Sequence, residues 1–123
     1  MTITITGASG FVGQNLLRFL KKDNDLIPLS IRNNQNKKFN LNSSVVIHLA
    51  GKAHDLKKTS KDKEYYEANT ELTKKVFNQF LESSSKVFIF MSSVKAAKDV
   101  VEGILSEDVI PDPVTVYGKS KLA

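Results

Sequence analysis

Three glycines near the start of the chain have a spacing that could hold a phosphate. Gly7, Gly10 and Gly13 follow an alternating β-branched run at residues 2–6 and overlap a helical pattern that begins at Val12. A strand, a glycine turn and a helix in this order present backbone N–H groups at the positive end of a helix dipole. Gly7 would permit the tight turn, Gly10 the close approach of a pyrophosphate, and Gly13 the packing of helix on strand. The turn predicts a dinucleotide site, and the alternative is a glycine-rich connection without a ligand.

A second set of polar residues stands in the last third of the chain. Tyr117 and Lys121 are four residues apart, so on a helix they share one face. An ammonium group beside a phenol favours the phenolate, which would let Tyr117 act as an acid or a base. Ser93 ends an apolar run, where a serine can take part in chemistry or cap the following turn. Each of these signals is weak by itself, and only their combination points to catalysis.

Composition limits the class of protein. The chain has 123 residues, of which 41% are hydrophobic and 25% charged, as is typical of one globular domain. It has no cysteine, so disulfides and cysteine metal sites are excluded, which fits a reducing compartment such as the cytoplasm. No apolar run approaches the length of a membrane span. The lysines behind the net charge of +5 are interleaved with acids, which favours a solvated face over a nucleic-acid surface.

The other titratable residues are interpreted as structural or solvated. His48 stands in an apolar run, which is more typical of a hydrogen-bonded core histidine than of a ligand. The acids between residues 94 and 113 show no metal-ligand spacing and are expected in a solvated loop; they are Asp99, Glu102, Glu107, Asp108 and Asp112. The sequence therefore predicts no metal site.

Apolar periodicity predicts alternating strands and helices. Strands are expected at residues 2–6, 26–31, 44–51 and 87–91, with a very short one at 39–41, and helices at 11–22, at 60–82 and around 117–121. Pro28 argues against a regular central position for the second strand. The run at 44–51 is nearly all apolar, as in a strand buried on both faces of a parallel sheet. The pattern predicts an α/β fold with right-handed crossovers.

Five motifs taken together resemble those of one family. They are residues 6–13, 48–51, 65–69 with Thr73, 88–93 and 117–121. Their order is similar to that in extended short-chain dehydrogenase/reductases of the NAD-dependent epimerase/dehydratase family of nucleotide-sugar enzymes, over essentially the whole chain. The resemblance implies a three-layer αβα Rossmann-like parallel sheet, truncated after about five strands in the order 3-2-1-4-5. It also implies that residues 1–123 are the N-terminal part of an NAD(P)-binding domain, without the C-terminal substrate domain.

The resemblance assigns roles to single residues. Ser93 matches the residue that hydrogen-bonds the reacting sugar oxygen, Tyr117 the base that removes the hydroxyl proton, and Lys121 the lysine that binds the nicotinamide ribose. The residues matched to cofactor binding are Gly7, Ser9, Gly10, Phe11, Val12, Gly13, Arg32, Leu49, Ala50, Gly51 and Asn69. Asn69 lies on the apolar stripe of a helix and would equally suit a structural hydrogen bond to a loop.

The end of the second strand departs from the family pattern. NAD-binding members place an acidic residue there for the ribose 2′-hydroxyl, whereas this chain has the residues Ser30, Ile31, Arg32 and Asn33. Arg32 could accept a 2′-phosphate, which favours NADP slightly over NAD. The third strand and its crossover are also abbreviated, which leaves the adenine pocket undefined.

The implied activity belongs to a longer protein. It is hydride transfer between nicotinamide and a sugar carbon, in an NAD(P)-dependent epimerase or dehydratase acting on a UDP-sugar. An NADPH-dependent 4-ketoreductase of the dihydroflavonol-reductase type is an alternative that Arg32 suits better. A non-enzymatic dinucleotide sensor on the same fold is a further alternative, against which the presence of Tyr117 and Lys121 counts. Taken alone, this chain could also be only a non-catalytic dinucleotide-binding fragment or an interaction module. Related enzymes pair the long helix and the Tyr117 helix between two subunits, so a homodimer is also an expectation.

Overall fold

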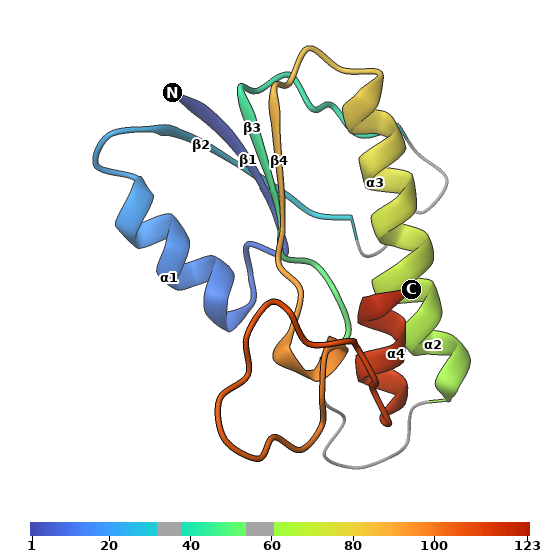
Figure 1. Ribbon diagram of the computed structural model, residues 1–123. Helices are drawn as coiled ribbons and strands as arrows, with labels where there is room; N and C mark the ends of the chain where they lie inside the picture. Colours follow the sequence, from blue (N-terminus) through green and yellow to red (C-terminus); the bar gives the residue numbers. More distant parts are fainter. Residues whose placement is uncertain (32–37, 54–60) are drawn as a thin grey trace. The chain divides into compact units, whose positions relative to one another are not determined.

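The computed structural model describes residues 1–31, 38–53 and 61–123, drawn in colour in Figure 1. The described chain divides into two units. The first contains Met1–Gly51 and Leu72–Met91, and the second contains Lys52–Glu71 and Ser92–Ala123. The glycine turn therefore belongs to the first unit, and Ser93, Tyr117 and Lys121 belong to the second.

A parallel sheet of four strands is the framework of the first unit. Its strands are β1 (Thr2–Thr6), β2 (Asp25–Leu29), β3 (Val45–His48) and β4 (Val87–Phe90), in the order β2-β1-β3-β4. In the middle of the sheet, Ile5 of β1 pairs with Pro28 on one side and Ile47 on the other. Every residue of β3 is buried, as its continuous apolar run predicts. The expected α/β Rossmann-like fold is confirmed.

The short strand expected at residues 39–41 does not form, although these residues are described. The Phe39 N–H donates to Gln79 Oε1 at 2.6 Å, and the Leu41 carbonyl oxygen accepts from Ser85 Oγ at 2.6 Å. Side chains thus satisfy backbone groups that a neighbouring strand would otherwise bond. The sheet of described strands ends at β2, where Pro28, which has no N–H to donate, is tolerated.

Helices cover both faces of this sheet (Figure 1). Helix α1 (Phe11–Leu20) packs on one face, where Leu16, Leu17 and Leu20 contact the cluster of Ile3, Ile5, Val45 and Ile47. Helix α3 (Leu72–Leu81) packs on the other face, where Leu72 and Val76 form a second cluster with Ile31. Strand β1 and strand β3 therefore lie between two apolar layers.

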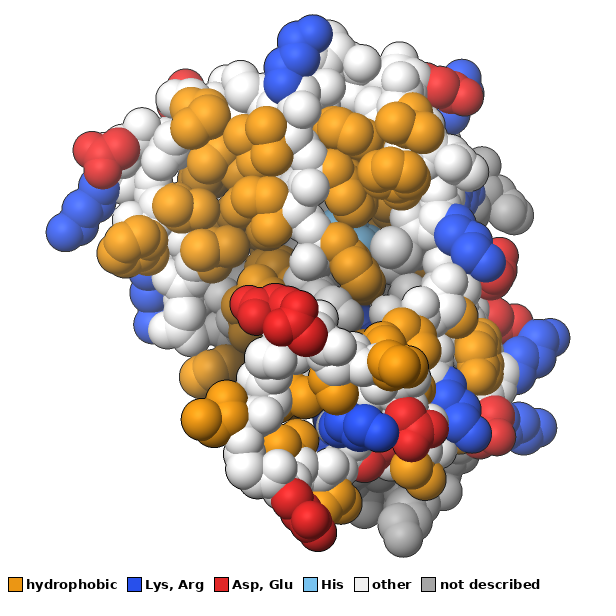
Figure 2. Space-filling model, viewed as in Figure 1, with side chains coloured by type: hydrophobic (Ala, Val, Ile, Leu, Met, Phe, Trp, Pro, Cys, Tyr) orange, Lys and Arg blue, Asp and Glu red, His pale blue; other side chains and the backbone are white. Residues whose placement is uncertain are grey.

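Strand β4 is the other edge of the described sheet, and it is only partly covered. The side chains of Val87 and Ile89 are exposed, and so are those of Phe11 and Phe19 on α1. Figure 2 shows apolar surface over the sheet of this unit. An apolar edge strand of this kind is suited to pairing or packing with further chain.

The second unit is built from short helical segments. Helix α2 (Asp62–Tyr66) runs into the π turn η1 (Glu67–Glu71), and Ser93 precedes the 3-10 turn η2 (Val94–Ala96). Helix α4 (Val116–Leu122) carries Tyr117 and Lys121. The helix expected at residues 60–82 is thus interrupted by a π turn, which buries two successive polar residues, Asn69 and Thr70. None of the helices within the described residues combines the length and apolar character needed to span a bilayer.

Candidate active site

The glycine turn has the tight geometry that its sequence predicts. Gly7 has a φ of +70°, a conformation that other residues rarely adopt. A Cβ at Gly7 would lie 2.7 Å from the Ala50 nitrogen and 2.8 Å from the Leu49 carbonyl carbon. A Cβ at Gly13 would overlap the Gly7 carbonyl oxygen, so helix α1 packs directly on the turn. The turn and the end of β3 are therefore in close backbone contact.

The N-terminus of helix α1 is open. Its first residue, Phe11, is 86% exposed, and Ser9, Gly10 and Val12 are also exposed. The first turn contains no acidic side chain, and no side chain caps it. Free N–H groups at the positive end of a ten-residue helix suit a phosphate group. The donor set at this turn therefore fits the pyrophosphate of a dinucleotide.

A buried polar chain fixes the strand ends behind the turn. His48 is fully buried, with its Nδ1 at 2.7 Å from Thr6 Oγ1 and its Nε2 at 2.9 Å from Thr73 Oγ1. The Ala50 N–H in turn donates to Thr6 Oγ1 at 3.2 Å. His48 is thus a hydrogen-bonded core histidine, as expected. The two threonine partners were not foreseen, because neither lies near His48 in sequence.

Asn69 has a full set of partners inside the second unit. Its Oδ1 accepts from the Lys52 N–H at 2.7 Å, and its Nδ2 donates to the Lys52 carbonyl oxygen and to Ser120 Oγ, each at 2.9 Å. Beside it, Thr70 Oγ1 donates to the Ser120 carbonyl oxygen at 2.8 Å. These hydrogen bonds are those expected if Asn69 has a structural role, and they connect the π turn to helix α4. Contact between Asn69 and a cofactor stays a prediction.

The three residues expected to be catalytic all lie in the second unit. Tyr117 and Lys121 are one turn apart on α4, and α4 packs against η2, the turn that Ser93 begins. Ser93 Oγ accepts from the Lys95 N–H at 3.2 Å, so Ser93 does cap this turn. Burial lowers the pKa of Lys121, because desolvation penalises the ammonium form. Capping does not exclude chemistry, since a hydroxyl can accept one bond and donate another.

One of the loop acids, Asp99, is largely buried and not solvated. Asp99 was expected in a solvated loop, but its side chain is only 12% exposed. Its Oδ2 accepts from the N–H groups of Val114 at 2.6 Å and Thr115 at 3.1 Å, next to the start of α4. The spacing of 15 residues between Asp99 and Val114 gives no local signal of this contact.

The expectations about Arg32 and about metal binding concern residues outside the contacts described so far. Arg32, the residue behind the preference for NADP, lies outside the described residues. Within the described part of the chain, no group of three or more His, Asp or Glu side chains could hold a metal ion. The remaining cofactor candidate of this region, Gly51, directly follows Ala50 at the end of β3 and is exposed.

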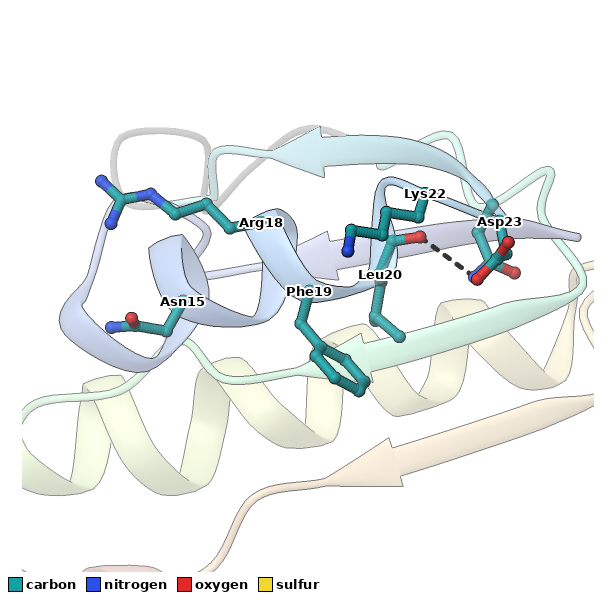
Figure 3. Close-up of a pocket in the computed structure, with 7 residues that line it drawn as sticks. Asn15, Arg18, Phe19, Leu20, Lys22 and Asp23 are labelled. Atoms are coloured by element: carbon teal, nitrogen blue, oxygen red, sulfur yellow. Dashed lines mark hydrogen bonds between the residues drawn. The ribbon is translucent and has the colours of Figure 1, made fainter.

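A hollow in the first unit lies at the far end of α1 from the glycine turn. It has a volume of about 430 Å³ and is lined by Asn15, Arg18, Phe19, Leu20, Lys22, Asp23 and Asn24, as Figure 3 shows. The Asn24 amide donates to the Leu20 carbonyl oxygen there at 3.1 Å. The carbonyl end of a helix disfavours anions. This hollow therefore does not suit the pyrophosphate expected at the turn.

Comparison with known proteins agrees with these features. The model of the NAD dependent epimerase/dehydratase family matches residues 3–123. The chain belongs to this family. A curated relative, UDP-glucose 4-epimerase of Vibrio cholerae, is 35% identical in an alignment that covers 76% of this chain and 35% of that protein. This family member thus spans about a third of its curated relative.

Two solved structures show the shared fold. RMD from Pseudomonas aeruginosa, complexed with NADPH, has a TM-score of 0.81 at 25% identity, over 98% of this chain and 46% of that chain. UDP-glucuronic acid 4-epimerase from Bacillus cereus, in complex with NAD, has a TM-score of 0.84 at 24% identity, over 99% and 49%. The family member described here therefore spans about half the length of each.

Proposed function

We propose that this chain is the cofactor-binding part of an NAD(P)-dependent epimerase or dehydratase that acts on a nucleotide-sugar. The observation that carries the proposal is the presence, in a chain of this family, of a glycine turn with an open helix end together with Ser93, Tyr117 and Lys121. A UDP-sugar is the proposed substrate class, since the 35% identical relative is a UDP-glucose 4-epimerase.

The proposed chemistry separates the hydride from the proton. The chemistry supplied by a nicotinamide held at this site would be hydride transfer from and to a sugar carbon. Tyr117 would remove the hydroxyl proton of that carbon, and Ser93 would donate a hydrogen bond to the same oxygen. Lys121 would bind the nicotinamide ribose and favour the phenolate of Tyr117. The backbone N–H groups of residues 11–13 would bind the pyrophosphate, with Leu49, Ala50 and Gly51 beside the turn.

The described contacts support a fixed position for helix α4. The Asn69 amide and the Thr70 hydroxyl hold it through Ser120, one residue before Lys121. An active-site helix held by buried side-chain bonds keeps its groups aligned without the entropy cost of ordering them during the reaction. Asn69 would thus contribute by positioning α4 rather than by direct chemistry.

A 4-ketoreductase is the second candidate. Its support is the neighbour at 25% identity, which is complexed with NADPH, together with the basic residue Arg32 where NAD-binding members have an acid. A dinucleotide-binding fragment without catalysis is the third, and it applies to this chain taken alone. A homodimer and a cytoplasmic location stay predictions from the sequence.

Calorimetric titration of the chain with NAD, NADH, NADP and NADPH tests the proposal and separates the candidates. We expect binding of at least one pair, because the turn and the open helix end are formed. Preference for NAD and NADH would favour the epimerase or dehydratase, whereas preference for NADP and NADPH would favour the reductase. The matched variant Arg32→Ala should lose a preference for the phosphorylated pair and leave a preference for NAD unchanged. A folded chain that binds none of the four contradicts the proposal.

A further inference from the structure

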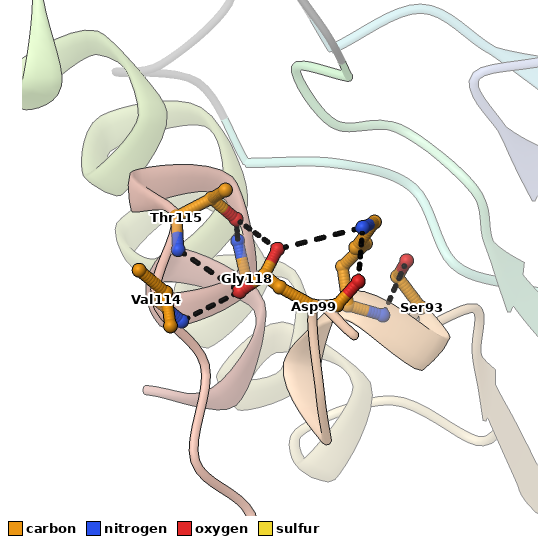
Figure 4. A network of polar contacts seen from close by, with 6 residues as sticks. Ser93, Asp99, Val114, Thr115 and Gly118 are labelled. Atoms are coloured by element: carbon orange, nitrogen blue, oxygen red, sulfur yellow. Dashed lines mark hydrogen bonds and ion pairs between the residues drawn. The ribbon is translucent and has the colours of Figure 1, made fainter. Parts of the chain in front are cut away.

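The segment between Ser93 and α4 contains a polar network that the proposed chemistry does not use. Figure 4 shows its members around Asp99, and all of them belong to the second unit. Asp99 Oδ2 accepts from the N–H groups of Val114 and Thr115, and Asp99 Oδ1 accepts from Thr115 Oγ1 at 3.1 Å. A single carboxylate therefore takes three hydrogen bonds from the two residues that precede α4.

Thr115 connects Asp99 to helix α4 by hydrogen bonds. It is the N-cap residue of α4, and its Oγ1 accepts from the Gly118 N–H at 3.1 Å. The hydroxyl proton is donated to Asp99, so the lone pairs remain free for the helix N–H. Asp99 is thus linked through one hydroxyl to the first turn of the helix, next to Tyr117.

The other side of Asp99 leads back to Ser93. Lys95 Nζ donates to the Asp99 carbonyl oxygen at 2.8 Å and lies 3.6 Å from Asp99 Oδ1. The N–H of the same lysine donates to Ser93 Oγ. A Cβ at Gly118 would overlap the Lys95 carbonyl oxygen, which shows that η2 and α4 are in direct backbone contact. A continuous series of bonds therefore joins Ser93 to the start of α4 through Asp99.

An ion pair and a backbone hydrogen bond connect the two ends of the loop beside this network. Lys98 Nζ lies 3.1 Å from Asp112 Oδ2, and the Asp112 N–H donates to the Ala97 carbonyl oxygen at 2.8 Å. The Lys98–Asp112 pair is more exposed than Asp99, so its charges are better screened. Within the described residues, Lys95 is the cation that pairs with Asp99, whereas Lys98 pairs with Asp112.

We propose that Asp99 is a positioning residue that fixes helix α4, and with it Tyr117 and Lys121, against the turn that begins at Ser93. Its value to catalysis rests on the function proposed above, but its effect on α4 does not. Asp99 holds the helix at its N-terminus, while Asn69 and Thr70 hold it through Ser120 at the C-terminal half. Helix rotation and tilt are then limited at both ends.

The test follows the side chain of Lys121 by NMR as the pH is raised, in the chain without cofactor. Asp99→Ala removes all three bonds, so we expect α4 to loosen and the pKa of Lys121 to rise toward that of an ordinary lysine. Asp99→Asn retains an oxygen for both backbone N–H groups and should keep the pKa of Lys121 as low as in the parent chain. Asp108→Ala, an exposed acid of the same loop, is the control and should change nothing.

An Asp99→Ala chain that is less stable but has an unchanged Lys121 titration would overturn the proposal, since a purely structural role predicts that result. An equal effect of Asp108→Ala would overturn it as well. If Asp99→Ala does not fold, Thr115→Val takes its place, because it keeps both backbone bonds to Asp99 and removes the two bonds of the Thr115 hydroxyl, one to Asp99 and one from the Gly118 N–H. An unchanged Lys121 titration in Thr115→Val would also overturn the proposal. Because no cofactor is added, this result is independent of the calorimetric test.

Discussion

Gly10 is the residue at which access to the helix end can be tested most directly. It precedes α1 with a φ of −76° and a ψ of 172°, an extended conformation that any residue adopts. Its glycine is therefore not required by backbone strain, in contrast to Gly7 with its φ of +70°. A Cβ at Gly10 would lie 3.3 Å from the Gly7 carbonyl oxygen, a tight contact. Packing within the turn and close approach of a ligand are therefore both physical reasons for a glycine at this position.

The pair Gly10→Asn and Gly10→Asp separates charge from bulk. Both side chains are favourable N-caps and differ little in size, so both variants should fold. A carboxylate at the helix end repels a pyrophosphate, and we expect the dissociation constant for the preferred dinucleotide to be at least about tenfold higher for Gly10→Asp than for Gly10→Asn. Calorimetry checks this difference. Equal affinities in the two variants would place the phosphates elsewhere.

At the scale of elements, the second unit depends on polar contacts more than on apolar packing. Helix α4 has only seven residues, too few to be stable alone, and side chains of the π turn and of Asp99 make hydrogen bonds to it or to the residues just before it. The pKa of Asp99 is lowered by the bonds from the Val114 and Thr115 N–H groups, then by the Thr115 hydroxyl and the charge of Lys95, while burial acts in the opposite direction.

This lowered pKa predicts an acid dependence of stability. Because the folded pKa lies below the unfolded one, the stabilising effect of Asp99 is fully present above the ordinary value of 3.8 and is lost as the pH falls through the folded value. Other carboxylates titrate in the same range, so the comparison needs Asp99→Asn, which cannot ionise. We expect the advantage of the parent chain over Asp99→Asn to be constant above about pH 5 and to shrink below it. Urea unfolding at a series of pH values measures it, and a constant difference throughout would refute the expectation.

At the scale of the whole molecule, the family match extends over residues 3–123, while the curated relative and the solved neighbours are two to three times longer. The β4 edge retains exposed apolar side chains. A protein of this size with incomplete burial is expected to be of modest stability. Ligand binding should therefore raise its free energy of unfolding by a measurable amount.

Binding of the preferred dinucleotide should stabilise the chain by mass action. At a concentration of about 100 times the dissociation constant, the free energy of unfolding is expected to rise by about 2.7 kcal/mol. Urea unfolding with and without the dinucleotide measures the change, and the Gly10→Asp variant provides the control. A rise of the same size in the control would indicate binding away from the glycine turn.

The sequence by itself determined the features that depend on local spacing. The glycine turn, the buried strand at β3 and the helix of Tyr117 and Lys121 all follow from periods of two or 3.6 residues and from the steric properties of glycine. Pro28 argued against a regular central position for the second strand, but the expected order 3-2-1-4-5 still placed a further strand beside it. The motifs also indicated the family, because five weak signals occur together in one order.

Only the tertiary structure decided the partners of isolated polar residues. Asp99 looks like any loop acid until the chain returns to place Val114 and Thr115 beside it, and Asn69 meets Ser120 across 51 residues. The π turn and the absence of a strand at residues 39–41 also depend on residues distant in sequence. The π turn buries two polar residues, Asn69 and Thr70. At residues 39–41, the side chains of Gln79 and Ser85 bond backbone groups that a neighbouring strand would otherwise bond. Hydrogen-bond partners are set by where the fold brings groups together, and apolar periodicity carries no record of that.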